Sequence, residues 1–190
     1  MGKLQLILMA CFTVIAMPMV NSIFQDSREI DQWIHELTHA KQKVTHLHFY
    51  FHDTFSGPSP TAIVIARSNM TDKSPTLFGL TTMIDDPLTE GPELDSKEVG
   101  RAQGFYGSSG QKTVGLLMAT TLVFTGKEYN GSTLTVLGRN PALEPHRELP
   151  IVGGTGVFRL ARGFAMLKTY SFNSTTGDAI VEYHVTVIHY

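Results

Sequence analysis

The sequence predicts an all-β protein with a single domain, and three observations support this. From Val44 onward, apolar Leu47, Phe49 and Phe51 alternate with polar residues, as in a strand with one buried face. Seven further strand-like runs follow, separated by Gly, Pro, Asn and Asp turn residues. Only the segment before Val44 shows a helical pattern, so we expect a closed antiparallel barrel or a sandwich.

The runs after the first strand extend over Thr61 to Arg67, Phe78 to Ile84, Glu98 to Tyr106, Thr113 to Phe124, Ser132 to Leu137, Val157 to Tyr170 and Ala179 to Tyr190. Between them, Asp86-Pro87 and Asn130-Gly131 are typical of turns. Gly153-Gly154-Thr155-Gly156 is interpreted as a flexible connection or a bulge, because no Gly-Lys-Ser/Thr follows as a phosphate loop requires. The last run is an exposed edge unless it pairs with the first strand or another subunit, which favours closure.

Residues 1–22 have the pattern of a secretory signal peptide. Lys3 precedes an uncharged run from Leu4 to Val20, and small or polar residues follow, so we expect cleavage after Ser22. No basic stop-transfer cluster follows, which argues against a membrane anchor. The protein is therefore expected to be secreted.

Residues 23–43 are expected to form an N-terminal arm or short helix. Ile30, Trp33, Ile34 and Leu37 recur there at helical spacing. Residues 44–190 form the predicted barrel domain, which no repeat or low-complexity linker divides.

Composition limits the stabilising bonds and the partners of the mature chain. The one cysteine, Cys11, lies in the predicted leader, so stability must come from a core and not from disulfides. A net charge of −2 without a basic stripe argues against nucleic acid and anionic membranes as partners. A small neutral molecule or the protein itself is expected instead. Asn69, Asn130 and Asn173 begin glycosylation sequons beside turn residues.

Asp53 is the strongest candidate for chemistry from the residues alone. It is in register with Leu47, Phe49 and Phe51, so alternation directs its carboxylate toward the apolar face of the strand. Burial there would raise its pKa toward the range of a general acid or base. The alternative is that the strand has ended and Asp53 caps a turn with Thr54 and Ser56.

Two weaker patterns also bear on ligands. In the run from Val157 to Tyr170 the odd positions are mostly small, which would leave room for a ligand inside a barrel of about eight strands. Small residues could equally face a neighbouring subunit or relieve strain in a curved strand. His46, His48 and His52 have a spacing that could bind zinc. Polar residues on a solvent face give the same spacing, so no metal site is predicted.

The chain resembles the plant dirigent proteins. The resemblance rests on motifs in the family's order across nearly the whole mature chain: His48-Phe49-Tyr50-Phe51-His52-Asp53, Asp85-Asp86-Pro87-Leu88, Gly100-Arg101-Ala102-Gln103-Gly104-Phe105-Tyr106, and Gly153-Gly154-Thr155-Gly156 with Ala161-Arg162-Gly163. It implies an eight-stranded antiparallel β-barrel, similar to allene oxide cyclase and lipocalin-like barrels. It also implies a homotrimer with one pocket per subunit and an address in the apoplast or cell wall.

Within the family, the chain is most similar to the legume branch that includes pterocarpan synthase, an isoflavanol dehydratase. The similarity lies in the segments 83–93 and 129–134. Members that guide coniferyl alcohol coupling usually carry Gly-Ala-Asp-Pro where this chain has Gly138-Arg139-Asn140-Pro141. The resemblance therefore implies dehydration and ring closure of a 2′-hydroxyisoflavanol, in isoflavonoid phytoalexin biosynthesis. The alternative is a non-catalytic guide for phenoxy-radical coupling, which works with a separate oxidase.

The implied reaction needs an acid at the 4-hydroxyl and a group that positions the 2′-hydroxyl, in a pocket that excludes water. It needs no metal, nucleotide or redox cofactor. The family pattern places catalytic residues at Asp53, Arg147 and Tyr106 and substrate-binding residues at Asn140 and Thr169. From the sequence alone, Arg147 lies in a surface loop. The aromatic residues predicted to form pocket wall or core are Phe49, Phe51 and Phe172.

Overall fold

The computed structural model describes residues 27–190. The predicted signal peptide at 1–22 lies outside these residues. The short helix expected before the barrel forms as α2 (Ser27–Leu37). Its last turn is held by the Thr38 hydroxyl, which donates to the carbonyl of His35 at 2.7 Å. Among the described residues, no helix is both long enough and apolar enough to cross a membrane.

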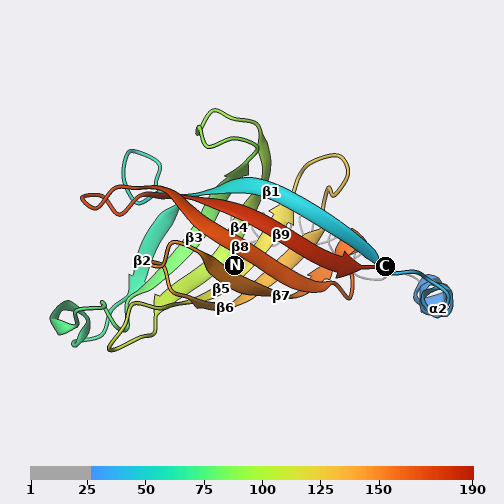
Figure 1. Ribbon diagram of the computed structural model, residues 1–190, viewed down its shortest axis with the longest axis horizontal. Helices are drawn as coiled ribbons and strands as arrows, with labels where there is room; N and C mark the ends of the chain where they lie inside the picture. Colours follow the sequence, from blue (N-terminus) through green and yellow to red (C-terminus); the bar gives the residue numbers. More distant parts are fainter. Residues whose placement is uncertain (1–26) are drawn as a thin grey trace, which may run out of the picture. The chain divides into compact units, whose positions relative to one another are not determined.

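Residues 42–190 form a second unit, a closed antiparallel β-barrel of eight strands (Figure 1). The strands of the ring are β1 (Lys43–Asp53), β3 (Thr81–Thr89), β4 (Glu98–Ser108), β5 (Leu116–Phe124), β6 (Thr133–Asn140), β7 (Arg147–Thr155), β8 (Arg162–Phe172) and β9 (Ala179–His189). Each pairs with the next along the chain from β3 to β9. The first and last strands close the ring over eleven residue pairs, from Lys43–His189 to Asp53–Ala179. The predicted fold class is confirmed.

The eight predicted runs are not the eight strands of the ring. The run at 61–67 is β2 (Ala62–Ala66), an extra strand that pairs only with β3. The strand that the sequence prediction missed is β7, whose residues were interpreted as a loop and a glycine-rich connection. Likewise, residues 157–161 are not part of β8, because the 3₁₀ turn η2 (Gly156–Phe158) intervenes.

Strand β7 escaped prediction because Pro150, Gly153 and Gly154 are poor strand residues. The β6–β7 pairing ends at Val136–Ile151 and does not include Pro150, the residue next to Ile151. The N–H group that Pro150 lacks therefore costs no bond to β6 in that pairing. The register shifts between the pairs Thr135–Gly153 and Val136–Ile151, so the bulged residue is Val152. It directly precedes the glycine-rich segment in which the sequence suggested a bulge as one alternative. A side chain at Gly154 would lie 2.6 Å from the carbonyl oxygen of Thr133, so only glycine fits there.

Strand β3 continues through Asp86-Pro87, which the sequence predicted to be a turn. The N–H of Asp85 donates to Thr61 on the β2 side, so by alternation Pro87 faces the same side. Pairing with β2 ends at Ile84 and pairing with β1 begins at Leu88. Pro87 therefore lies in a gap where no ladder bond is required. As a result, Asp86 stays in the strand and points inward with none of its surface exposed.

The barrel interior follows the period of two. Phe49 and Phe51 of β1, Val185 and Val187 of β9, and Ala165 and Leu167 of β8 are all buried. The odd positions of β8 thus face inward, as expected. The small residues Gly163 and Ala165 do not leave room for a ligand, however, because neither lines the cavity described below. That cavity is lined by Leu167, Thr169 and Phe172 of this strand. A side chain at Gly163 would lie 2.0 Å from the carbonyl oxygen of Thr186, so this glycine permits close approach of β9.

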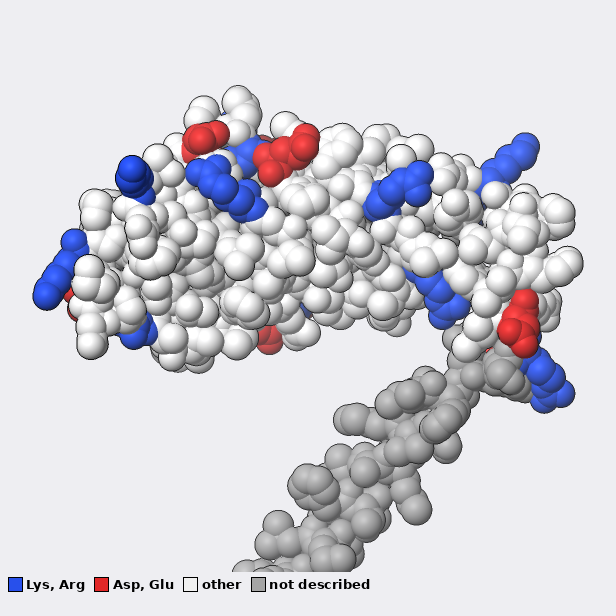
Figure 2. Space-filling view, turned by 90° about the horizontal axis from the view of Figure 1, so that it is seen from below, with Lys and Arg blue, Asp and Glu red and all other residues white. Residues whose placement is uncertain are grey.

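Charged side chains are sparse on the face of the barrel that Figure 2 shows. Lysines and arginines stand singly or beside acidic residues, over a mostly uncharged surface. Among the ion pairs of the barrel, Arg101 pairs with Asp85 and with Glu98.

Candidate active site

A cavity of about 470 Å³ opens at one end of the barrel. Its wall comes from the last residues of β1, β4, β6 and β8 and from the first residues of β5, β7 and β9. In an antiparallel ring these strand termini meet at the same end. The volume lies within the range of about 300–1,000 Å³ that is usual for sites of small organic ligands. The lining is mainly apolar, with a small number of polar groups.

Asp53 is the last residue of β1 and lines this cavity. Its Oδ2 accepts a hydrogen bond from the Tyr106 hydroxyl at 2.7 Å. The other oxygen, Oδ1, is buried and has no protein partner among the described residues.

The turn-capping alternative for Asp53 is wrong, because another carboxylate does that work. Asp178 accepts hydrogen bonds from the backbone N–H groups of Phe55 and Ser56, and from the Ser56 hydroxyl. The bond from the Ser56 hydroxyl is the largest cause that lowers the pKa of Asp178 to about 2, and a bond from the Thr176 hydroxyl is the next largest.

The surroundings of Asp53 favour its protonated form. Burial raises the pKa of this carboxyl to about 6, against the opposing effect of the hydrogen bond from Tyr106. Burial, followed by the charge of Asp53, raises the pKa of the Tyr106 hydroxyl above its ordinary value. Tyr106 therefore remains a hydrogen-bond donor, while Asp53 is able to exchange a proton near neutral pH.

Arg147 and Thr169 form a second polar group in the wall of the cavity. Arg147 begins β7 and is only 4% exposed, so the surface-loop interpretation is wrong. Its Nη2 donates to the Thr169 hydroxyl at 2.9 Å and its Nη1 to the carbonyl of Ala142 at 3.2 Å. Burial lowers the pKa of Arg147, an effect that the neighbouring Tyr183 opposes. The Nε of Arg147 and the Oδ1 of Asn140 are buried without a protein partner among the described residues.

Asp86 is a second buried carboxyl that sequence reasoning missed. Its Oδ1 accepts a hydrogen bond from the Thr61 hydroxyl at 2.5 Å. Burial raises the pKa of Asp86 to about 8, and the charge of Asp53 is the next largest cause. Asp53 therefore loses its proton first, and Asp86 stays neutral at neutral pH. The available signal was Asp86 in register with Ile84, but the Asp-Pro pair was interpreted as a turn.

The predicted aromatic residues separate into two groups. Phe51 lines the cavity and is 4% exposed, and Phe172 lines its rim and is 61% exposed. Phe49, predicted to form pocket wall or core, does not line the cavity and belongs to the core. It lies one layer deeper, stacked on Tyr183 at a ring-centroid distance of 5.4 Å. Tyr183 was missed, although the inward alternation of β9 marks it, and its ring lines the cavity. Burial raises the pKa of its hydroxyl.

The three sequon asparagines are all exposed, in or beside turns, which is where a glycan could be carried. Glycosylation of Asn69, Asn130 and Asn173 stays a prediction. The three histidines considered for zinc do not come together. His52 is buried, with its Nε2 2.6 Å from the Thr89 hydroxyl, whereas His46 bonds Thr186 on the outside of the barrel.

Comparison with known proteins places this geometry in a family. A model of the dirigent-like protein family matches residues 44–188. Dirigent protein 23 of Arabidopsis thaliana is 50% identical over 182 residues, 95% of each chain. Pterocarpan synthase 1 of Glycyrrhiza echinata is 54% identical over 151 residues, 79% of this chain and 80% of the relative.

The solved structure of the pterocarpan synthase dirigent protein GePTS1 superimposes with a TM-score of 0.75 at 53% identity. The match covers 80% of this chain and 87% of that one. A family model that spans nearly the whole barrel, relatives at half identity and the same fold lead to one conclusion. The chain belongs to the dirigent protein family.

Proposed function

We propose that this protein catalyses the dehydration and ring closure of a 2′-hydroxyisoflavanol to a pterocarpan. The observation that carries the proposal is the Asp53 carboxyl, held by Tyr106 in a mainly apolar cavity with a pKa raised to about 6. Relatives named pterocarpan synthase, at about 54% identity, support the same substrate class. Lyase chemistry follows from the proposed reaction, in which one water molecule leaves.

The first step is departure of the 4-hydroxyl, which is a poor leaving group until it is protonated. Asp53 in its acid form gives a proton to that oxygen, the C4–O bond breaks and water is released. The phenolic ring shares the positive charge that develops at C4, which gives a cation with the character of a protonated quinone methide. Tyr106 stabilises the carboxylate left behind through its 2.7 Å hydrogen bond.

The second step is closure of the new ring. The oxygen of the 2′-hydroxyl attacks C4 and loses its proton to the Asp53 carboxylate, which restores the acid form. The Arg147 guanidinium stabilises negative charge on the attacking oxygen, while Thr169 and Asn140 hold substrate hydroxyls in one orientation. The unpartnered Asn140 Oδ1 and Arg147 Nε supply an acceptor and a donor for this purpose. Protons and electrons balance without any further reactant.

The proposal is tested by incubating the purified protein with 2′-hydroxyisoflavanol in the absence of an oxidant. We expect pterocarpan to form faster than in buffer and with one handedness at the new ring junction. Heat-denatured protein is the control. A rate equal to that of buffer would overturn the proposal.

The second candidate is the non-catalytic guide that binds phenoxy radicals made by a separate oxidase. It is supported by relatives named only as dirigent proteins, such as the one from Arabidopsis thaliana at 50% identity. The assay that separates the two supplies coniferyl alcohol with and without laccase. Enantiomeric excess that depends on laccase, together with no dehydration of the isoflavanol, would favour the guide.

The predicted homotrimer, secretion and apoplast address are part of the same proposal. Sedimentation equilibrium of the secreted protein tests the trimer, with a mass of three glycosylated subunits as the expected result. The mass of a single subunit would contradict it.

A further inference from the structure

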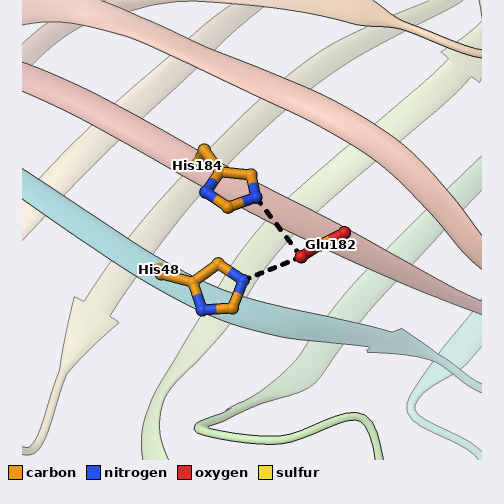
Figure 3. Close-up of side chains that lie close together, drawn as sticks. All are labelled: His48, Glu182 and His184. Carbon is orange, nitrogen blue, oxygen red and sulfur yellow. Dashed lines mark hydrogen bonds and ion pairs between the residues drawn. The ribbon is translucent and has the colours of Figure 1, made fainter.

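Three metal-ligating side chains meet on the outside of the barrel, away from the cavity. His48 lies on β1, and Glu182 and His184 lie on β9 (Figure 3). The Nε2 of His48 is 3.0 Å from Glu182 Oε1, and the Nε2 of His184 is 3.3 Å from the same oxygen. All the potential ligand atoms lie within 4.8 Å of one another. Figure 3 shows one nitrogen of each ring directed toward the same oxygen of the Glu182 carboxylate, which lies beside the two rings.

The spacing suits a small four-coordinate cation. Zinc binds imidazole nitrogen and carboxylate oxygen at about 2.0–2.1 Å, so the edge of its ligand tetrahedron is about 3.3 Å. The two measured N···O distances, 3.0 and 3.3 Å, match such edges. A cation between these atoms would take the Nε2 lone pair of each ring, with the ring proton on Nδ1.

The strands hold the three side chains in place before any metal binds. His48 is directly opposite His184 in the β1–β9 register, and their rings stack at 4.5 Å. The Tyr50 hydroxyl donates to Glu182 Oε1 at 3.4 Å, which orients the carboxylate. Outer hydrogen bonds of this kind fix the ligands of metal sites. The side chain of Glu182 is 21% exposed, while those of His48 and His184 are more open to solvent at 43% and 61%.

We propose that His48, Glu182 and His184 form a binding site for a divalent cation of the zinc class, with water as the fourth ligand. Two imidazoles and one carboxylate are ligands that zinc accepts, and hard cations such as calcium or magnesium prefer all-oxygen sites. The site is independent of the proposed function, because its ligands lie on the outer face of β1 and β9. The neighbouring residues Phe49 and Tyr183 point into the barrel.

The position of the site suggests what the metal does. It would join the first strand of the barrel to the last, across the seam where the ring closes. His48 and Glu182 are 134 residues apart in the sequence, so a link between them closes a long loop. Cross-links that close long loops limit the unfolded chain most. Residues 27–190 contain no cysteine, so a bound metal would supply the kind of cross-link that disulfides provide in many secreted domains.

Titration calorimetry of the secreted protein with zinc chloride tests the site. We expect one saturable zinc site per chain in the wild type. Loss of an outer hydrogen bond alone weakens metal sites by about 10–100-fold, so His184→Ala, which removes a ligand, should weaken binding by at least about 100-fold. His46→Ala is the matched control, since His46 is on the same strand and bonds Thr186, and it should bind zinc like the wild type.

Two further measurements keep the result decisive. Cobalt in place of zinc should give the intense visible absorption of a four-coordinate site in wild type and in His46→Ala, but not in His184→Ala. Zinc should slow unfolding in urea for the same two proteins only, and isoflavanol dehydration should not change in any of them. Absence of saturable binding, or equal zinc affinity in His184→Ala and wild type, would overturn the proposal.

Discussion

The two ends of the barrel are built from the same strands but differ in whether their buried polar atoms have hydrogen-bond partners. At the end away from the cavity, Phe158 packs against Phe124, Tyr129 and His189 with ring-centroid distances of 5.0–5.7 Å. At this end His189 lies within hydrogen-bond distance of the Thr45 hydroxyl at 2.9 Å and of the carbonyl of Val157 at 3.0 Å. At this end aromatic rings pack together, and both ring nitrogens of His189 have hydrogen-bond partners.

The cavity end is neither filled nor fully satisfied. Asp53, Asn140 and Arg147 each keep one buried polar atom without a protein partner among the described residues. A buried polar group in that state costs free energy of folding, about 1–3 kcal/mol. The difference indicates that stability is concentrated at the aromatic end, while the cavity end keeps groups that a ligand can satisfy.

The largest expected effect on stability comes from emptying the aromatic end. Phe158→Ala removes a fully buried ring and should lower the free energy of unfolding by about 3–5 kcal/mol. The control at the cavity end is Phe172→Ala, whose ring is 61% exposed and should cost less than about 0.5 kcal/mol while it raises KM. Urea unfolding of both variants measures this. Equal losses of stability would show that the two ends do not differ in this way.

The next largest effect concerns Arg147 in the wall of the cavity. Arg147→Met keeps the length of the side chain and removes the charge and the bond to Thr169. We expect turnover of the isoflavanol to fall by about 10²–10³-fold, as for loss of one preorganised donor. Arg147→Lys, which keeps the charge without the planar fork, should lie in between. Full activity in Arg147→Met would limit the residue to a structural role.

A substitution at Asp86 tests how much a buried carboxyl lowers the free energy of unfolding. Its pKa is raised to about 8, so the folded protein retains a proton that the unfolded chain releases near pH 4. The retained proton lowers the free energy of unfolding. This loss of stability is absent below about pH 4, grows as pH rises and is complete above about pH 8. Asp86→Asn should therefore stabilise the protein by a few kcal/mol at pH 8 and hardly at all at pH 4. Urea unfolding at the two pH values checks the difference, and an equal effect at both would contradict a titrating Asp86.

The smallest effect is a shift in the pH profile of the reaction. If acid-form Asp53 is the donor, the rate falls as pH rises through a pKa of about 6. Tyr106→Phe removes the hydrogen bond that lowers the pKa of Asp53, so the midpoint should move upward. Asp86→Asn should leave the midpoint in place, because Asp86 is neutral in that range. A midpoint that moves downward in Tyr106→Phe would contradict this account of the Asp53 carboxyl.

Sequence periodicity predicted the barrel well because most strands bury one face only. It was sufficient to place Asp53 on the inner face. The pairing of β9 with β1 was one of two ways in which the sequence allowed the last strand to avoid an exposed edge. It failed at β7 and at Asp86-Pro87, where a proline or glycine breaks the local rule but the neighbouring strand leaves a gap for it. Such gaps depend on the register of other strands, so a single segment does not reveal them.

The candidate site was predictable in part. Alternation alone identified Asp53, and the family resemblance supplied Tyr106, Asn140, Arg147 and Thr169, which the structure brings around one cavity. The role of Asp178 in capping the turn after β1 was not predictable, because its partners are 122 and 123 residues away. Contacts between distant segments follow from how the ring closes, which a local pattern does not encode.

The central claim is that Asp53 donates the proton, and one substitution tests it most directly. Asp53→Asn keeps the size of the side chain and the acceptor for Tyr106 but loses the exchangeable acid. Turnover of 2′-hydroxyisoflavanol should fall by about 10²–10⁴-fold. The thermal midpoint at neutral pH should not fall, because an amide costs less to bury than a carboxylate. A folded Asp53→Asn protein with near wild-type turnover would contradict the claim and place the acid elsewhere in the cavity.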